Sequence, residues 1–224
     1  MTEDPPTPRA DHEPAFRAPG IAVLVALSMP ALFFLQQRLH DQGFGLALFP
    51  RAVMDGQWTG LFTSMFLHAD WTHAGMNAVG ALAFGTPVAR LMRGAGGAAF
   101  FLAFYMACGV LSALGYVLLN PAGADPVVGA SGAVFGLIGA STRLMGRGRV
   151  LPLLDRRVLS MAAVWMGLNL VIGLIGLSAV GLGTRIAWEA HAAGFMVGIL
   201  AIGPIGRLFP PGIAPQSRLS DSLH

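Results

Sequence analysis

Three short polar clusters begin otherwise apolar stretches of this 224-residue chain. The first cluster holds His73 and Asn77, the second holds Ser131, and the third holds His191. A serine hydroxyl becomes an effective nucleophile when a neighbouring base takes its proton, and neutral histidine suits that task near pH 7. Ser131 and His191 are therefore a candidate nucleophile and its candidate base.

The first cluster offers hydrogen-bond donors for a negatively charged reaction centre. His73 and Asn77 lie four residues apart, which places them on one face of a helix. Both side chains can donate to a developing oxyanion, and so can the backbone N–H of Ser131 near a helix N-terminus. Asn77 taken alone could equally be a polar residue that bonds another membrane helix.

Each cluster also has a simpler explanation when it is taken alone. A serine between glycines is usually a packing residue in a membrane helix, and His191 could be a metal or haem ligand together with His68 and His73. Metal sites in helix bundles pair histidines with supporting partners, whereas a serine and an asparagine accompany them here. These companions favour the serine–histidine chemistry over a metal site, which stays the alternative from the residues alone.

The composition indicates whether these residues act in water or in a membrane. The chain is 54% hydrophobic and 11% charged, whereas soluble domains carry about 25% charged residues. This composition favours an integral membrane protein embedded in a lipid bilayer. The net charge of +3 is small and the arginines lie in predicted loops, so no nucleic-acid partner is expected.

Six apolar runs approach the length of roughly 20 residues that crosses a bilayer. The expected fold class is all-α, a polytopic membrane protein with a bundle of six transmembrane helices in residues 19–206. Residues 1–18 are expected to form a disordered cytoplasmic tail, and residues 207–224 a second cytoplasmic tail. The six predicted spans are residues 19–38, 73–92, 98–119, 128–146, 158–178 and 187–206.

Arginine placement predicts the orientation, because short cytoplasmic loops collect basic residues. If the N-terminus is cytoplasmic, eleven of the arginines lie inside and three lie outside. The second, fourth and sixth spans then run inward, and their polar clusters lie just below the outer face at similar depth. The connection over residues 39–72 is too apolar for a free loop, and we expect it to be re-entrant or interfacial.

Glycines give the fourth and sixth spans surfaces that permit a close approach. Small residues at helical spacing let two helix backbones come together in a membrane. Such an approach would allow Ser131 and His191 to hydrogen-bond across the interface. The glycines expected to pack at the site are Gly129, Gly132, Gly136, Gly194 and Gly198.

The ordered set of motifs resembles the rhomboid intramembrane serine proteases. It consists of H-x-x-x-N from His73 to Asn77, G-x-S-G over residues 129–132, and A-H-x-x-G-x-x-x-G over residues 190–198. Each motif is unspecific by itself, but their order and their placement in the second, fourth and sixth spans match the family. The resemblance covers roughly residues 19–206.

The resemblance implies a serine–histidine dyad without a catalytic carboxylate, a metal or another cofactor. Ser131 would attack a peptide bond, His191 would act as base and then as acid, and His73, Asn77 and the Ser131 amide would stabilise the oxyanion. The implied substrates are single-span membrane proteins cut near the outer membrane face. The implied location is the bacterial inner membrane, with both termini cytoplasmic and the active site facing outward.

Two residues depart from the family pattern. Many bacterial members carry tyrosine where this chain has Phe135, whose ring can still stack on the histidine although it lacks the hydroxyl. The tryptophan–arginine pair that is frequent in the first outer loop is absent, because Thr59 follows Trp58. The alternative to a protease is a non-proteolytic relative that binds membrane clients, but such relatives typically lack the serine or the histidine.

Overall fold

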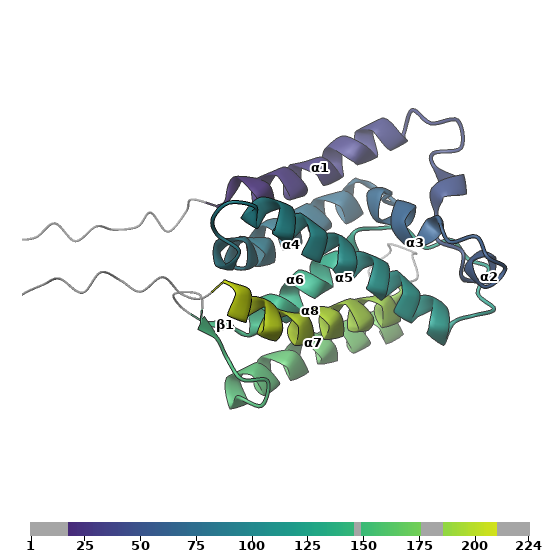
Figure 1. Ribbon diagram of the computed structural model, residues 1–224. Coiled ribbons are helices and arrows are strands. Elements are labelled where there is room, and N and C mark those ends of the chain that lie inside the picture. Colours follow the sequence, from purple (N-terminus) through teal and green to yellow (C-terminus); the bar gives the residue numbers. More distant parts are fainter. Residues whose placement is uncertain (1–17, 146–148, 176–185, 210–224) are drawn as a thin grey trace, which may run out of the picture.

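The computed structural model describes residues 18–145, 149–175 and 186–209, and within these ranges the chain is a bundle of helices (Figure 1). The predicted terminal tails lie almost wholly outside the described residues, as does the predicted end of the fifth span at residues 176–178. The α-helices are α1 (Gly20–Gln36), α2 (Pro50–Met54), α3 (Gly60–Thr63), α4 (Trp71–Leu91), α5 (Gly97–Leu119), α6 (Ser131–Thr142), α7 (Arg156–Ile175) and α8 (Trp188–Leu208).

The described chain is mostly helical, with small additions that the sequence did not predict. Two 3-10 helices, η1 (Phe44–Leu46) and η2 (Ser64–Phe66), lie in the connection between α1 and α4. Strand β1 (Leu144–Met145) pairs antiparallel with β2 (Arg149–Val150) beyond the end of α6.

The predicted spans match the long helices closely, except for the fourth. The other five agree with α1, α4, α5, α7 and α8 to within three residues at each described end. The prediction of a helix over residues 128–146 was too long, because α6 begins at Ser131 and ends at Thr142. Gly129 has φ +126°, which is not a helical conformation, and β1 follows directly after Arg143.

The length and composition of the helices identify three of them, among the described residues, as able to cross a membrane. These are α5, α7 and α8, while α1 and α6 are shorter apolar helices. The twelve residues of α6 span about 18 Å, which is less than the roughly 30 Å of a hydrocarbon core. The predicted count of six spans therefore stays a prediction.

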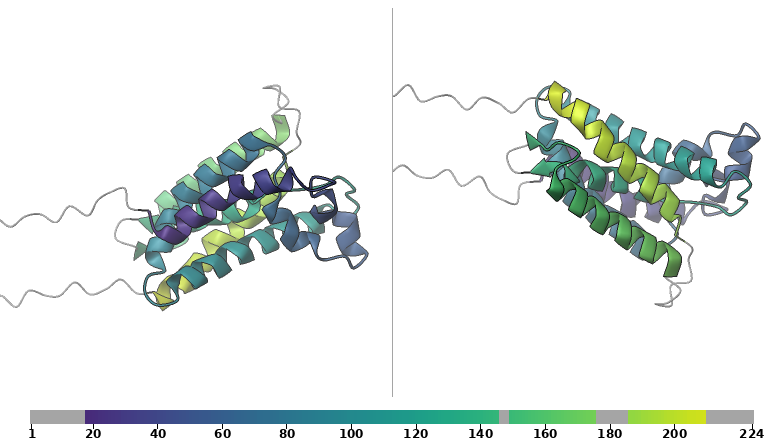
Figure 2. Two further views of the ribbon diagram at one scale, coloured as in Figure 1. Left: turned by 90° about the horizontal axis from the view of Figure 1, so that it is seen from above. Right: turned by 90° about the horizontal axis from the view of Figure 1, so that it is seen from below.

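The long helices alternate in direction. In the two further views, α1, α5 and α7 run one way along the bundle, and α4, α6 and α8 run the other way (Figure 2). The first residues of α4, α6 and α8 therefore lie at the end of the bundle that carries α2 and α3. This arrangement brings the three polar clusters of the sequence to one end of the molecule.

Helix α6 occupies the centre of the bundle. It contacts α4, α5 and α8, and nine of its twelve residues are buried, so it has little surface left to face lipid. Its small side chains allow this position, because Gly, Ala and Ser let surrounding helices approach from several sides. A short, enclosed helix can hold a reactive side chain away from the lipid.

The connection between α1 and α4 contains only short elements and packs against the same end of the bundle. Leu48 pairs with Val127 in an isolated β-bridge, just before the segment that leads into α6. The backbone N–H of Gly129 donates to the carbonyl of Ser64 at 2.9 Å. The connection therefore fixes the backbone immediately ahead of Ser131.

Candidate active site

The hydroxyl of Ser131 and the ring of His191 meet between α6 and α8. Ser131 is the first residue of α6, and His191 lies in the first turn of α8. Their Oγ and Nε2 atoms are 2.8 Å apart, which is a normal hydrogen-bond distance. The two residues are 60 positions apart in sequence, so the pairing depends on how the two helices pack.

Glycines set the separation of α6 and α8. A β-carbon on Gly194 would collide with the carbonyl oxygen of Gly132, and one on Gly198 would collide with that of Gly136. The two backbones are therefore in direct contact at these positions, where a methyl group does not fit. These four glycines make the close contact that their spacing in the sequence predicts.

Helix α5 packs against both α6 and α8 where these two helices touch. Ser112 is buried, and its hydroxyl donates to the carbonyl of Ala190 at 2.6 Å. A β-carbon on Gly132 would collide with that same hydroxyl. The residue before His191 is therefore tied to α5 at the level where α6 begins.

The ring of Phe135 lies flat against the ring of His191. Their centroids are 4.3 Å apart and the planes differ by 5°. Phe135 follows Ser131 by four residues, so both side chains project from one face of α6 toward α8. Stacking restricts rotation of the imidazole and leaves its two nitrogens free to bond in the ring plane.

The second nitrogen of His191 contacts Asn169, a residue that the sequence analysis did not identify. Asn169 Oδ1 lies 3.0 Å from Nδ1 of the histidine, and Asn169 Nδ2 donates to the carbonyl of Trp188 at 2.9 Å. The signal for it was present, because an amide side chain inside an apolar span is a functional candidate by default. No hydrogen bond joins Glu189 to His191 within the described residues.

His73 and Asn77 lie beside the backbone that leads into α6. A β-carbon on Gly129 would lie 2.7 Å from Cε1 of His73 and 3.7 Å from Nδ2 of Asn77. The carboxylate of Asp70 caps α4 by accepting the backbone N–H of His73 at 2.7 Å. The capped start of α4 thus lies against Gly129, two residues ahead of Ser131.

One side-chain donor beside this segment has no hydrogen-bond partner among the described residues. Asn77 is buried, and its Nδ2 has no hydrogen-bond partner in the described part of the chain. Ser131 occupies the first turn of α6, and its N-cap, Ala130, provides no side-chain hydrogen bond. Helix N-termini present such free N–H groups, which suit an anionic oxygen.

Gly129 differs from the other glycines expected to pack at the site. It lies ahead of α6 and takes no part in the contact between α6 and α8. Its φ of +126° is a conformation that residues with a side chain rarely adopt. The physical reason for glycine here is the turn itself, together with the ring of His73 that lies against it.

His68 is buried beneath the same end of the bundle. Its backbone exchanges two hydrogen bonds with the side-chain amide of Gln36, both at 2.9 Å. Its ring packs edge-on against His73 with centroids 5.3 Å apart. Burial lowers the pKa of His68, and the nearby His73 lowers it further, so the ring is neutral near pH 7.

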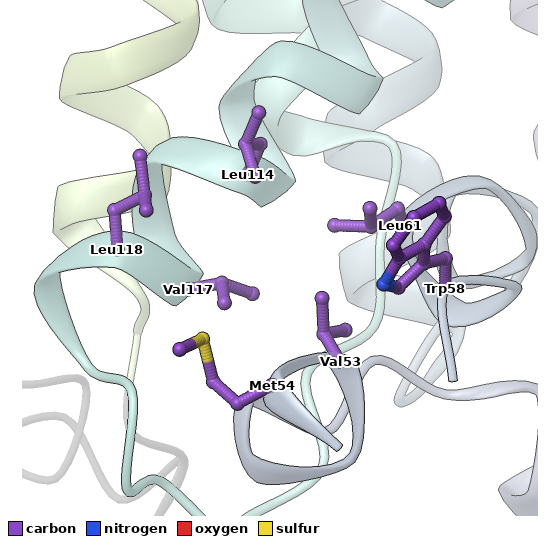
Figure 3. Close-up of a pocket in the computed structure, with 7 residues that line it drawn as sticks. All are labelled: Val53, Met54, Trp58, Leu61, Leu114, Val117 and Leu118. Atoms are coloured by element: carbon purple, nitrogen blue, oxygen red, sulfur yellow. The ribbon is translucent and has the colours of Figure 1, made fainter. Parts of the chain in front are cut away.

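A separate apolar groove lies between α2, α3 and the second half of α5 (Figure 3). Its volume is about 440 Å³, and the side chains that line it include Val53, Trp58, Val117 and Leu118. None of its seven lining residues can act as an acid, a base or a nucleophile. The groove therefore suits an apolar group and lacks the chemistry of the Ser131–His191 pair.

Comparisons with known proteins agree on one family. A family model described as the Rhomboid domain matches residues 55–207 of the chain. The chain is 34% identical over 113 residues to YdcA, a candidate rhomboid protease of Bacillus subtilis (strain 168), a match that covers 50% of this chain and 51% of that protein. It is 33% identical over 88 residues to the rhomboid protease GluP of the same organism, covering 39% of this chain and 16% of that protein.

The turn at Gly129 can be tested by substitution. Gly129→Ala should lower the free energy of unfolding more than Gly56→Ala does. The difference should be about 1–3 kcal/mol, which is the typical cost of overpacking. Both glycines have positive φ, but a β-carbon on Gly56 meets nothing within 4 Å, so this control carries backbone strain alone. Denaturation in detergent would measure the difference, and equal losses would show that His73 does not pack on this turn.

Proposed function

Because the chain belongs to the rhomboid family, we propose that it is an intramembrane serine endopeptidase with Ser131 as nucleophile and His191 as base. The observation that carries this proposal is the 2.8 Å separation of Ser131 Oγ and His191 Nε2 across two helices. The chain's match spans about half of the first relative, YdcA, and less of GluP. The activity, the substrates and the arrangement in the membrane are therefore proposals for this chain.

The proposed reaction proceeds in two acyl-transfer steps. Ser131 Oγ attacks the carbonyl carbon of a peptide bond while its proton passes to Nε2 of His191. The tetrahedral intermediate collapses, the C–N bond breaks, and His191 returns the proton to the leaving amine. Water then attacks the acyl–serine ester with His191 as base, which releases the new carboxyl terminus and restores the hydroxyl of Ser131.

The negative charge of the intermediate requires donors on the far side of the carbonyl. We assign this role to the side chains of His73 and Asn77 and to the backbone N–H of Ser131. Asn77 Nδ2 is buried without a partner in the described residues, and a preorganised, unpaired donor is what an oxyanion needs. The support for His73 is its position against Gly129, two residues from the nucleophile.

The proposed substrates are single-span membrane proteins, cut near the outer membrane face. Three helices of the described chain are long and apolar enough to cross a bilayer, and α1, α4 and the central α6 would complete the six proposed spans. The surplus of arginines in the loops assigned to the inside supports cytoplasmic termini. The proposed location is the bacterial inner membrane, as the resemblance to the family implies.

Cleavage of a model single-span substrate by the purified full chain tests the proposal. Ser131→Ala should abolish cleavage, because no hydroxyl remains to form the acyl intermediate, and His191→Ala should do the same. Ser141→Ala is the matched control, since this second serine of α6 bonds the carbonyl of Ile138 at 2.9 Å and lies outside the site. It should cleave at the rate of the unsubstituted protein.

Cleavage that persists in folded Ser131→Ala would overturn the mechanism. Absence of cleavage in the unsubstituted protein, combined with specific capture of single-span proteins, would instead favour the non-proteolytic client-binding alternative.

The oxyanion assignment predicts an intermediate loss of activity. Asn77→Ala should lower kcat by about 10²–10³-fold, the typical effect of removing one oxyanion donor, while the remaining donors preserve measurable cleavage. Steady-state kinetics in detergent would give kcat and KM separately. An unchanged kcat would remove Asn77 from the oxyanion site.

A further inference from the structure

Asn169 is an exception on its own helix. Beyond Ser160, the outward side chains of α7 are apolar and well exposed, as expected for a helix that faces lipid, whereas Asn169 is 4% exposed and turned toward α8. Val158 is the other buried residue that α7 contributes among those described. Polar side chains in membrane helices face the bundle interior and pair there, so the partner of Asn169 indicates its role.

The chemistry of its neighbours fixes how the amide of Asn169 is oriented. The carbonyl of Trp188 can only accept a hydrogen bond, so the amide nitrogen Nδ2 must face it, at 2.9 Å. The amide oxygen Oδ1 is then the atom that faces Nδ1 of His191, at 3.0 Å. Because Oδ1 can only accept, Nδ1 of the histidine must carry a hydrogen.

The orientation of the amide determines the tautomer of the histidine. A neutral imidazole with its hydrogen on Nδ1 leaves a lone pair on Nε2. Nε2 is the nitrogen that lies 2.8 Å from Ser131 Oγ, so it can accept the proton of the hydroxyl. The other tautomer would point an N–H at the serine and could not act as its base.

We infer that Asn169 is a positioning residue that holds His191 in the Nδ1–H tautomer, with Nε2 free to accept the proton of Ser131. The inference rests on the proposed function for its catalytic consequence and on the hydrogen-bond geometry for the tautomer itself. Asn169 does not touch the reacting atoms. It acts through the histidine, and its anchor on the Trp188 carbonyl keeps the amide from turning over.

A neutral partner suits the surroundings of this pair. A carboxylate at the same place would bring a full charge into the apolar interior of a membrane protein, which is costly. The amide provides the same acceptor without net charge, and hydrogen bonds in such low-dielectric surroundings are strong and directional. His191 is then held by Asn169 in the ring plane and by Phe135 on the ring face.

Kinetics of three variants of the full chain separate positioning from packing. Asn169→Ala should lower kcat by about 10–100-fold, the range found when a metal-bound histidine loses the partner that orients it, and leave KM nearly unchanged. Asn169→Asp keeps an acceptor for Nδ1 but loses the donor to Trp188. Its buried charge should lower the stability of the protein, but the folded variant should recover most of the lost kcat. Val158→Ala, which removes buried α7 packing away from the site, should leave kcat unchanged.

A purely structural role predicts a different pattern. If Asn169 only ties α7 to α8 through the Trp188 carbonyl, the alanine and aspartate variants are equally impaired, and that result would overturn the inference. A similar fall of kcat in Val158→Ala would also overturn it, because general loosening of α7 would then explain the effect.

The tautomer can be measured without any activity. Nitrogen-15 NMR of histidine-labelled protein distinguishes Nδ1–H from Nε2–H, and comparison with His191→Ala assigns the signal. We expect a single Nδ1–H form in the unsubstituted protein and a mixture in Asn169→Ala. An Nε2–H form, or no change in the variant, would refute the inference, whereas failure of the unsubstituted protein to cleave any substrate would refute the proposed function alone.

Discussion

The direct contact between the backbones of α6 and α8 is the constraint on which the candidate site depends. Between helices in lipid there is no hydrophobic driving force, so association relies on close packing and hydrogen bonds. Gly132 against Gly194 and Gly136 against Gly198 let the two backbones touch with no side chain between them. A hydrogen bond between side chains from the two helices requires that their separation be held this firmly.

The groups held by this contact form a chain of hydrogen bonds between uncharged side chains. It runs from the carbonyl of Trp188 through Asn169 and His191 to the hydroxyl of Ser131. In a low-dielectric interior, such a chain avoids the cost of burying a charge while each bond strengthens its neighbours. The arrangement explains how a histidine can be oriented for proton transfer where a carboxylate would be expensive.

Much of this architecture could be predicted from the sequence, because its signals are local. Long apolar runs predicted α1, α4, α5, α7 and α8 to within three residues at each described end, and glycine spacing predicted the contact of α6 with α8. Ser131 and His191 stood out as polar residues at the start of apolar spans, and the structure brings these two side chains within hydrogen-bond distance. Their catalytic roles stay a proposal.

Other features could not be predicted because they depend on tertiary geometry. The late start of α6 follows from the turn at Gly129, whose backbone has φ +126° and lies against the ring of His73. Its early end is followed by strand β1. Asn169 becomes significant only when the rotation of α7 about its axis is known, since a different rotation would turn the amide to lipid. The burial of His68 likewise reflects its docking against Gln36 across 32 residues of sequence.

The most direct measurement is the rate at which a fluorophosphonate modifies Ser131 in Gly198→Ala, compared with Gly167→Ala. Gly198 lies two turns from His191 and cannot touch the reagent, whereas Gly167 on α7 has open space around it. If backbone contact holds the pair, Gly198→Ala should remain helical but react up to about 10²-fold more slowly, the cost of misplacing reacting groups by about 1 Å. Gly167→Ala should react at the rate of the unsubstituted protein. A folded Gly198→Ala protein that reacts at the unsubstituted rate would contradict the dependence of Ser131 on this contact.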